Sequence, residues 1–332
     1  MDELNSFNPT LQKMSSILQE TVIRFATPSF ALLDFPDHAN VGDSAIWVGE
    51  LQLFRSLTGT APSYVSAFHN LDADALRAAV PEGTIFLHGG GNFGDIWNHH
   101  QDFREAMLTR FRDRRIVQMP QSIHYDDPHR IARTARAISG HPDFTLLVRD
   151  EPSLELARRH FECPVHLCPD SALAIGATCP TLPTLDVIAM LRTDKEGVAG
   201  GAATLPGLRV EDWLAEDGGA VRRAKAAAML RAWTKLAPST ARARAYEAAA
   251  WHRVERGFRQ LSQGRAIVTD RLHVHILAML LGRPHAVLDN FYGKIGRFMD
   301  AFTGGSPLVH RASDLEEAVA WARGVGSMRE AA

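Results

Sequence analysis

The chain contains 332 residues, of which 45% are hydrophobic and 22% charged, a composition typical of globular proteins and a length sufficient for two domains. Lys and Arg number 36 against 38 Asp and Glu, so the formal net charge of -2 provides no broad basic field that would hold nucleic acid. Any anion-binding site must therefore be local. The three cysteines form no C-x-x-C pair, which argues against a disulfide framework and against a cysteine zinc site.

No targeting segment is recognisable at the N-terminus. The first residues are acidic and include no apolar core of signal-peptide length, and nowhere in the chain do about 18 apolar residues follow one another. We therefore expect a cytoplasmic protein with reduced cysteines and no membrane-spanning segment.

The first half of the chain alternates buried apolar runs with helical patterns. A leading helix is expected to extend to about residue 23, with further helices at residues 44–57 and 152–160. Strands are expected at residues 29–35, 84–88, 115–119, 144–149 and 165–168. Repeated units of a strand followed by a helix predict an α/β fold, in which helices cover a parallel sheet.

Periodicity stops at residues 178–184, where proline and threonine accumulate, so we place a boundary there between domains at residues 1–180 and 181–332. The second half repeats the same order of elements. Strands are expected at residues 185–191, 266–269 and 286–288. Helices are expected at residues 219–236 and 240–262, at 271–281 with Gly282 as its end, and at 314–323 with Ser313 as its cap.

Four segments that follow strands are rich in polar residues and glycine. Ligands of open α/β sheets bind beyond the carboxyl ends of the strands, so these segments are the first candidates for a binding site. They are residues 37–43 (DHANVGD), 88–95 (HGGGNFGD), 120–125 (PQSIHY) and 269–273 (TDRLH).

The glycine-rich segment matches the G-x-G-x-x-G pattern at Gly89, Gly91 and Gly94, which would let the backbone approach a phosphate at a helix N-terminus. A dinucleotide site would also require an acidic residue at the end of the next strand, and the strand before Pro120 has none. The alternative is a tight turn that serves only the packing of a helix on a strand.

The TDRLH segment gives the strongest physical signal. Arg271 and His273 are expected in the first turn of a helix, whose unpaired N–H groups and dipole favour an anion. The arginine adds a planar fork of donors for phosphate or carboxylate. In the alternative interpretation, Asp270 only caps the helix and Arg271 forms a surface ion pair.

Five motifs together resemble those of the polysaccharide pyruvyl transferases: N-x-G-D at 40–43, G-G-G-N-x-G-D at 89–95, P-Q-S-I-H at 120–124, R-D-x-x-S at 149–153 and R-L-H at 271–273. The resemblance implies two Rossmann-like lobes, similar to those of two-domain (GT-B type) glycosyltransferases. The implied reaction transfers pyruvate from phosphoenolpyruvate to a sugar residue of a bacterial exopolysaccharide repeat unit, as a cyclic ketal. No metal and no cofactor are expected for it.

The resemblance also implies partners and roles. The partners would be phosphoenolpyruvate and a sugar or lipid-linked oligosaccharide at the inner face of the membrane, while peripheral membrane association and homo-oligomer formation stay open. Arg271, His273 and the backbone of Leu272 would hold phosphoenolpyruvate from the second lobe. The first lobe would contribute Arg149, His88, Gly90 and Gly91 to the donor site.

The catalytic residues implied are Arg271, His273 and a histidine of the first lobe. His124, which directly follows a strand, is the first choice for that histidine, and His88 is the second. The acceptor sugar would be oriented by polar side chains of the first lobe, namely Asn40, Asp43, Asn92 and Asp95.

Two other functions remain open, a nucleotide-sugar-dependent glycosyltransferase and a non-catalytic sugar-phosphate-binding protein. A metal site is not expected, because neither the neighbours His99 and His100 nor the pair His273 and His275 would converge on one ion. Aromatic residues in helical patterns are expected to pack in the core rather than stack on a sugar, and these are Trp47, Trp97 and Trp251.

Overall fold

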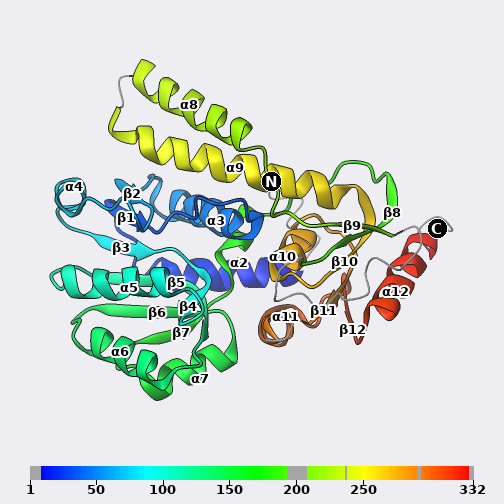
Figure 1. Ribbon diagram of the computed structural model, residues 1–332, viewed down its shortest axis with the longest axis horizontal. Coiled ribbons are helices and arrows are strands. Elements are labelled where there is room, and N and C mark those ends of the chain that lie inside the picture. The colour runs from blue at the N-terminus through cyan, green and yellow to red at the C-terminus, as the bar shows by residue number, and fades with distance from the viewer. Residues whose placement is uncertain (1–8, 193–207, 236–237, 290–292, 329–332) are drawn as a thin grey trace.

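The computed structural model describes residues 9–192, 208–235, 238–289 and 293–328, which form two lobes, each built on a parallel β-sheet (Figure 1). The first sheet has the order β2-β1-β3-β5-β6-β7, and β4 pairs with the second half of β5. Its strands are β1 (Phe30–Leu33), β2 (Tyr64–Ser66), β3 (Thr84–Leu87), β4 (Gly90–Gly94), β5 (Ile116–His124), β6 (Phe144–Val148) and β7 (Val165–Leu167).

Helices cover both faces of the first sheet because apolar side chains of its strands alternate between the two faces. Phe30 and Leu32 of β1 pack in a core with α2 (Pro9–Val22) and α3 (Val41–Thr58). Ala31 and Leu33 of the same strand pack in a second core on the opposite face. The helices of that face are α4 (Ala73–Ala79), α5 (Asn98–Arg110), α6 (Pro128–Ser139) and α7 (Glu151–His160).

The second sheet has the order β12-β11-β10-β8-β9, again with parallel pairing. Its strands are β8 (Leu185–Met190), β9 (Arg209–Glu211), β10 (Gly264–Thr269), β11 (His285–Leu288) and β12 (Val309–Ala312). The helices of the second half are α8 (Gly218–Thr234), α9 (Ala241–Ser262), α10 (Leu272–Leu280), α11 (Lys294–Phe298) and α12 (Leu315–Met328). Three short turns are η1 (Ser171–Ile175), η3 (Pro238–Thr240) and the π-helical η4 (Met299–Thr303). The expected α/β fold with two Rossmann-like lobes is confirmed.

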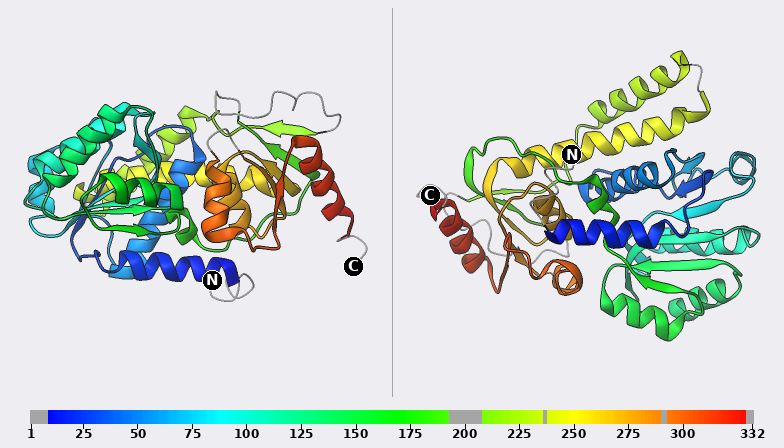
Figure 2. Two further views of the ribbon diagram at one scale, coloured as in Figure 1. Left: turned by 90° about the horizontal axis from the view of Figure 1, so that it is seen from below. Right: turned by 180° about the vertical axis from the view of Figure 1, so that it is seen from behind.

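One apolar core joins the two lobes, because α9 of the second half packs on α3 of the first (Figures 1 and 2). Two glycines allow close approach around α3. A Cβ on Gly257 of α9 would lie 2.5 Å from Cγ1 of Val41, and a Cβ on Gly49 of α3 would lie 1.9 Å from the carbonyl oxygen of Ser171. Neither position tolerates a larger residue without movement of its neighbour, so α3 is held tightly between α9 and η1.

Most expected strands and helices are confirmed, but two expected loops are strands. Strand β5 continues through Pro120 to His124, so the prediction that this strand ends at residue 119 is wrong. Pro120 lies within a register shift between Gln118 and Gln121, where a missing N–H is tolerated. Residues 90–94 form β4 instead of a turn into a helix, and α5 begins only at Asn98.

The ends of two later helices also differ from expectation. Helix α12 packs on the second sheet and is capped by Asp314, whose Oδ1 accepts from the N–H of Glu317 at 2.8 Å. Ser313, the predicted cap, instead donates its hydroxyl to Glu317 at 2.7 Å. Helix α8 ends at Thr234, and residue 236 lies outside the described part of the chain. Among the helices that the structure describes, none is long and apolar enough to cross a membrane.

A buried pair of histidines lies inside the second lobe. Nδ1 of His275 lies 2.8 Å from Nε2 of His285, and Nε2 of His275 lies 2.9 Å from Oγ1 of Thr303. Nδ1 of His285 donates to the carbonyl oxygen of Arg283. Burial lowers the pKa of His285 to about 4, and burial together with His285 lowers the pKa of His275 well below its usual value. Both imidazoles are therefore neutral in the folded protein near neutral pH.

This pair predicts a loss of stability in acid. Because both folded-state pKa values lie below the ordinary value of 6.5, the stabilisation is complete above that pH and is lost as the pH falls from 6.5 toward 4. The loss should be about 1.4 kcal/mol per pH unit for each site that titrates. Urea unfolding between these pH values should show a shallower dependence for His285→Asn than for the parent. The matched change of an exposed histidine, His129→Asn, should leave the parent slope intact, and equal slopes for all three proteins would contradict the prediction.

Candidate active site between the lobes

A cavity of about 440 Å³ lies where the carboxyl ends of the first-lobe strands face the second lobe. Strands β1 and β3 end at it, and helices α3 and α10 begin at it. It is lined by Asp34, Pro36, His38, Asn40, Asp43, His88, Gly91, Asn92, Trp97, His99, His100, Arg149, Arg192, Trp213, Leu214, Arg271, Leu272, His273 and Lys294. Residues of four of the five sequence motifs meet here.

A larger cavity, of about 940 Å³, lies elsewhere, between α2, α3 and α9. Its lining consists mainly of serine, glutamine, threonine and apolar side chains, with the charged pair Glu255 and Arg259. It contains no residue of the five motifs. We therefore place the candidate site in the smaller cavity, because convergent charged groups mark a site more reliably than volume does.

A buried carboxylate, Asp170, connects the two lobes by contacting two residues of the cavity wall. Its Oδ2 accepts from Nη1 of Arg149 and lies 3.4 Å from Nε2 of His273, which comes from α10 of the second lobe. Burial raises the pKa of Asp170, but Arg149 and His273 outweigh burial and hold that pKa well below its usual value. Asp170 is therefore ionised, and it fixes an arginine of one lobe and a histidine of the other.

The N-x-G-D motif forms the first turn of α3, against which the ring of His273 packs. Asn40 caps the helix by accepting from the N–H of Gly42 at 3.0 Å, and its amide donates to Oδ2 of Asp43 at 2.8 Å. A Cβ on Gly42 would lie 2.4 Å from Nδ1 of His273. Glycine is therefore required at this position for the R-L-H motif to reach the site.

Arg271 is the N-cap residue of α10 and is 4% exposed. Its Nη2 lies 2.6 Å from Oδ1 of Asp212, so the ion pair is buried and the alternative of a surface ion pair is wrong. Arg271 also lies just before the helix and not in its first turn, where it was expected. Asp270 does not cap the helix but accepts from the backbone N–H of Arg192 at 2.8 Å. Within the described residues, the buried Nε of Arg271 has no hydrogen-bond partner, nor has Nε1 of the neighbouring cavity residue Trp213.

His88, at the end of β3, is held by a buried glutamate of α3. Nδ1 of His88 lies 2.7 Å from Oε2 of Glu50, while Oε1 of Glu50 accepts from the N–H of Gly89 at 2.9 Å. Burial by itself lowers the pKa of His88, but Glu50, with smaller contributions from Asp34 and Asp43, raises it above the usual value. His88 lines the cavity, and its buried Nε2 has no partner among the described residues.

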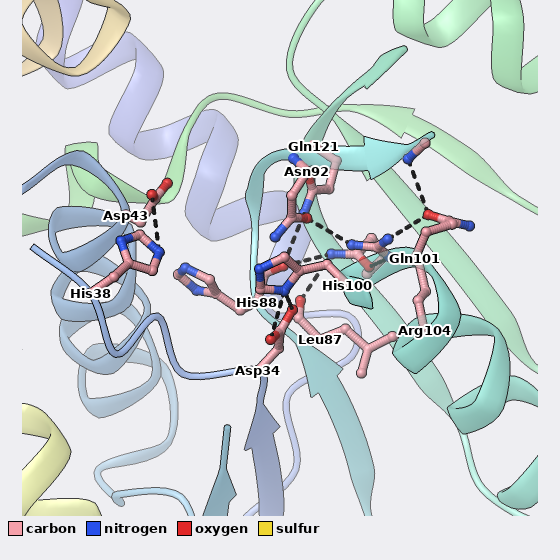
Figure 3. A network of polar contacts seen from close by, with 12 residues as sticks. Asp34, His38, Asp43, Leu87, His88, Asn92, His100, Gln101, Arg104 and Gln121 are labelled. Carbon is pink, nitrogen blue, oxygen red and sulfur yellow. Dashed lines mark hydrogen bonds and ion pairs between the residues drawn. The ribbon is translucent and has the colours of Figure 1, made fainter. Parts of the chain in front are cut away.

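A network behind the glycine-rich strand orients Asn92 (Figure 3). Oδ1 of Asn92 accepts from Nη2 of Arg104 and from Nε2 of Gln121, both at 2.9 Å. Arg104 also donates to Gln101, and burial lowers its pKa to about 10. Because the oxygen of Asn92 is used by these donors, its amide group is left to face the cavity as a donor.

A second histidine and carboxylate pair lies at the end of β1. Nδ1 of His100 lies 2.8 Å from Oδ2 of Asp34, and Figure 3 shows the ring turned toward that carboxylate. Asp34 has a φ of 71°, a left-handed backbone conformation that aspartate adopts at some cost. Such strain is often found at functional sites. The pair brings a further titratable group to the cavity wall.

Asp43 lies near three histidines and an arginine. His38 lies 3.6 Å from its Oδ2. Burial raises the pKa of Asp43, but His38, His273, His88 and Arg149 together lower it below the usual value. Asp43 is therefore an ionised acceptor of hydrogen bonds in the cavity wall.

The structure brings together most of the residues expected from the sequence, but three of them do not line the cavity. His124 and Asp95 do not line the cavity. His124 lies 3.1 Å from Asp126, and Asp95 accepts from the N–H groups of Asp126 and Asp127. Of the two first-lobe histidines considered, His88 is the one at the cavity. Gly90 lies behind its wall, with a φ of 127° that favours glycine.

Asp95, His124 and Asp126 also form the group among the described residues whose ligand atoms all lie within 4.8 Å of one another. Since Asp95 is already engaged by two backbone N–H groups, its carboxylate closes the turn after β5. We assign no metal to this group.

Several residues of the site escaped the sequence patterns. Glu50, Asp170 and Asp212 each bind a motif residue. In the sequence, Glu50 lies in an apolar helix pattern, Asp170 begins a stretch rich in threonine and proline, and Asp212 lies in an acidic segment. Trp97 was expected in the core but is 45% exposed at the cavity rim, whereas Trp47 is buried as expected. An acidic residue inside an apolar helix, as at Glu50, is a signal that could have been used.

Comparisons with known proteins agree with these motifs. A family model described as polysaccharide pyruvyl transferase matches residues 40–290. Pyruvyl transferase 1 of Schizosaccharomyces pombe is 30% identical over 294 residues, which cover 84% of this chain and 70% of that protein. EpsO of Bacillus subtilis, which bears a pyruvyl transferase name, is 29% identical over 326 residues, covering 95% of this chain and 98% of its own.

A solved structure supports the fold alone. A functionally uncharacterized protein of Klebsiella pneumoniae superimposes with a TM-score of 0.62 at 18% identity, over 91% of this chain and 99% of the other.

Proposed function

Because the chain belongs to the polysaccharide pyruvyl transferase family and is a transferase, we propose that it moves pyruvate from phosphoenolpyruvate to a sugar residue of an exopolysaccharide unit, forming a cyclic ketal. The two relatives described above are named as pyruvyl transferases. The donor, the ketal and the sugar are the parts that we infer from the cavity.

The observation that carries the proposal is a set of buried N–H donors around one cavity. Nε of Arg271, Nε1 of Trp213 and, in the protonated ring, Nε2 of His88 lie at its wall and have no partner among the described residues. A buried donor without a partner is costly, so a binding site for an anion or a hydroxyl group explains all three. Phosphoenolpyruvate offers two anionic groups and an ester oxygen as acceptors.

In the proposed complex, charge determines where phosphoenolpyruvate binds. The first N–H groups of α10 and Arg271 offer one end of the cavity to an anionic group, since a helix N-terminus and an arginine fork both favour phosphate or carboxylate. Arg149 faces the cavity from the other lobe, and a Cβ on Gly91 would lie 3.1 Å from its Nη2. A glycine at position 91 therefore keeps the path to this guanidinium open.

His88 is the general acid of the proposed reaction. Its raised pKa favours the imidazolium, and its Nδ1 is occupied by Glu50, so the proton on Nε2 is directed to the cavity. That proton goes to the methylene carbon of phosphoenolpyruvate, while a sugar hydroxyl attacks the adjacent carbon. The phosphate leaves with its bonding electrons as a second hydroxyl closes the ketal. One hydroxyl proton restores His88 and the other leaves with the phosphate.

The acceptor occupies the first-lobe side of the cavity. Asp43 and the amide of Asn92 offer an acceptor and a donor to sugar hydroxyls, and Asn40 holds Asp43 in place. Trp97, half-exposed at the rim, offers a flat apolar surface for a sugar ring. The reaction needs no metal, because the arginines, the histidines and the helix N-terminus balance the charge of the donor. The cavity opens to the surface, which suits the end of a lipid-linked chain.

Arg271 tests the donor. Arg271→Ala removes a charge-assisted contact and should weaken binding of phosphoenolpyruvate about tenfold to a hundredfold, as measured by titration calorimetry. Arg271→Lys should restore little, because lysine lacks the planar fork. Arg259→Ala, in the larger cavity, is the matched control and should bind like the parent. Tight binding of a nucleoside diphosphate with none of phosphoenolpyruvate would instead favour a nucleotide-sugar glycosyltransferase.

His88 tests the chemistry. His88→Gln should retain donor binding and lower the rate of ketal formation on a hexoside, followed by mass spectrometry, by about a hundredfold or more. Glu50→Gln should move the loss of activity at rising pH to lower pH, because Glu50 raises the pKa of His88. His124→Gln is the control and should keep parental turnover. Loss of turnover in His124→Gln with normal turnover in His88→Gln would reverse the assignment.

A further inference from the structure

Helix α8 exposes its large apolar side chains and buries its small ones. Val221 and Ala232 are buried on the side that faces α9, whereas Met229 is 43%, Leu230 65% and Trp233 60% exposed. Met229 and Trp233 are four residues apart and share one side of the helix, and Leu230 lies beside them. We call these three residues the apolar face of α8. This distribution is the reverse of a helix that is stabilised by packing its large apolar side chains against the protein.

The same segment carries the strongest local charge of the chain. Residues 218–246 contain seven Lys and Arg of the total of 36 and none of the 38 Asp and Glu. Only Arg223 and Lys225 have an acidic partner among the described residues. Exposed basic side chains lie before, within and after the apolar face along the sequence, and they include Arg222, Arg231, Arg242 and Arg244. A chain with a net charge of -2 therefore presents a strongly basic segment in the hairpin that α8 forms with the start of α9.

The hairpin of α8 and α9 is anchored beside the candidate active site. Nζ of Lys225 lies 2.6 Å from Asp37, which precedes the N-x-G-D motif, and Trp213 and Leu214 of the cavity wall lie just before α8. Figures 1 and 2 show α8 as the outermost layer of the molecule, with α9 between it and α3. Asp217 is the N-cap residue of α8, and Met229 lies 12 residues beyond it. At 1.5 Å per residue, the apolar face therefore begins about 18 Å along the helix from the end that lies near the cavity.

We propose that the apolar face of α8, with its basic flanks, docks on the surface of an anionic lipid bilayer. Tryptophan, leucine and methionine enter the interface between headgroups and acyl chains, while arginine and lysine remain at the phosphates. Nucleic acid would use the basic residues but not the leucine and methionine. A second copy placed face to face would bring two sets of seven basic residues together. An anionic bilayer satisfies both the apolar and the basic parts of this surface.

Docking in this way would hold the enzyme beside a lipid-linked acceptor, and this consequence rests on the proposed function. The docking itself does not, because it is measured without substrate. Failure of the vesicle experiment therefore leaves the pyruvyl transfer proposal untouched, and failure of the activity assays leaves docking untouched.

Vesicle sedimentation tests the proposal. The full chain should bind vesicles of phosphatidylcholine and phosphatidylglycerol in equal parts at least tenfold more tightly than vesicles of phosphatidylcholine alone, and added salt should weaken binding. The double variant Leu230→Glu and Trp233→Glu should lose binding by at least tenfold. Arg231→Glu should lose about fivefold or more. These side chains are exposed, so thermal unfolding should match the parent.

Matched controls are exposed residues elsewhere. Leu182→Glu and Arg159→Glu change an exposed apolar side chain and an exposed arginine outside the hairpin, and both variants should bind like the parent. Hairpin variants that bind anionic vesicles as tightly as the parent would overturn the proposal, as would a parent that binds neither type of vesicle. A parental dimer in ultracentrifugation that the double variant dissociates, without vesicle binding, would assign the surface to a second copy.

Discussion

The site depends on one buried carboxylate, Asp170, which binds Arg149 of its own lobe and contacts His273 of the other. The guanidinium of Arg149 could not be buried at this depth without a partner, because an unpaired charge in a protein interior costs several kcal/mol. Asp170 in turn caps η1, which packs on α3. The ion cluster and the apolar core between the lobes are therefore built on the same short segment.

The same arrangement is repeated around the cavity. Glu50 contacts His88, Asp170 contacts Arg149 and His273, and Asp212 contacts Arg271, so that these four side chains of the wall each have a carboxylate beside them. This explains how a chain with a net charge of -2 can gather arginines and histidines around one cavity. The carboxylates fix the orientation of the donors before a ligand arrives, so little reorganisation is needed when charge develops in the reaction. They also lower the net positive charge of the cavity wall.

The sequence predicted the parts of this site that follow strands or begin helices. Arg149 and Arg271 were recognisable because each follows an apolar run and precedes a helical pattern, and the order of elements followed from periodicity. The carboxylates that contact these cations were not recognisable from the sequence. Asp212 and Arg271, for example, are 59 residues apart and meet only in the folded chain. That His88 and not His124 lines the cavity could not be predicted, for a related reason. A strand with a register shift carries His124 past the cavity, and nothing in the local pattern marks where β5 ends. The short strands β4 and β9 likewise depend on their neighbours for hydrogen bonds, not on their own sequence.

The central claim is that donor and acid meet in the cavity between the lobes, and a crystal structure of the protein with phosphoenolpyruvate tests it most directly. We predict the donor in the cavity of about 440 Å³, with one anionic group on Nε of Arg271 and the N-terminus of α10. Its methylene carbon should face Nε2 of His88. Phosphoenolpyruvate bound in the larger cavity between α2 and α9, or bound here with its methylene carbon turned away from His88, would contradict the claim.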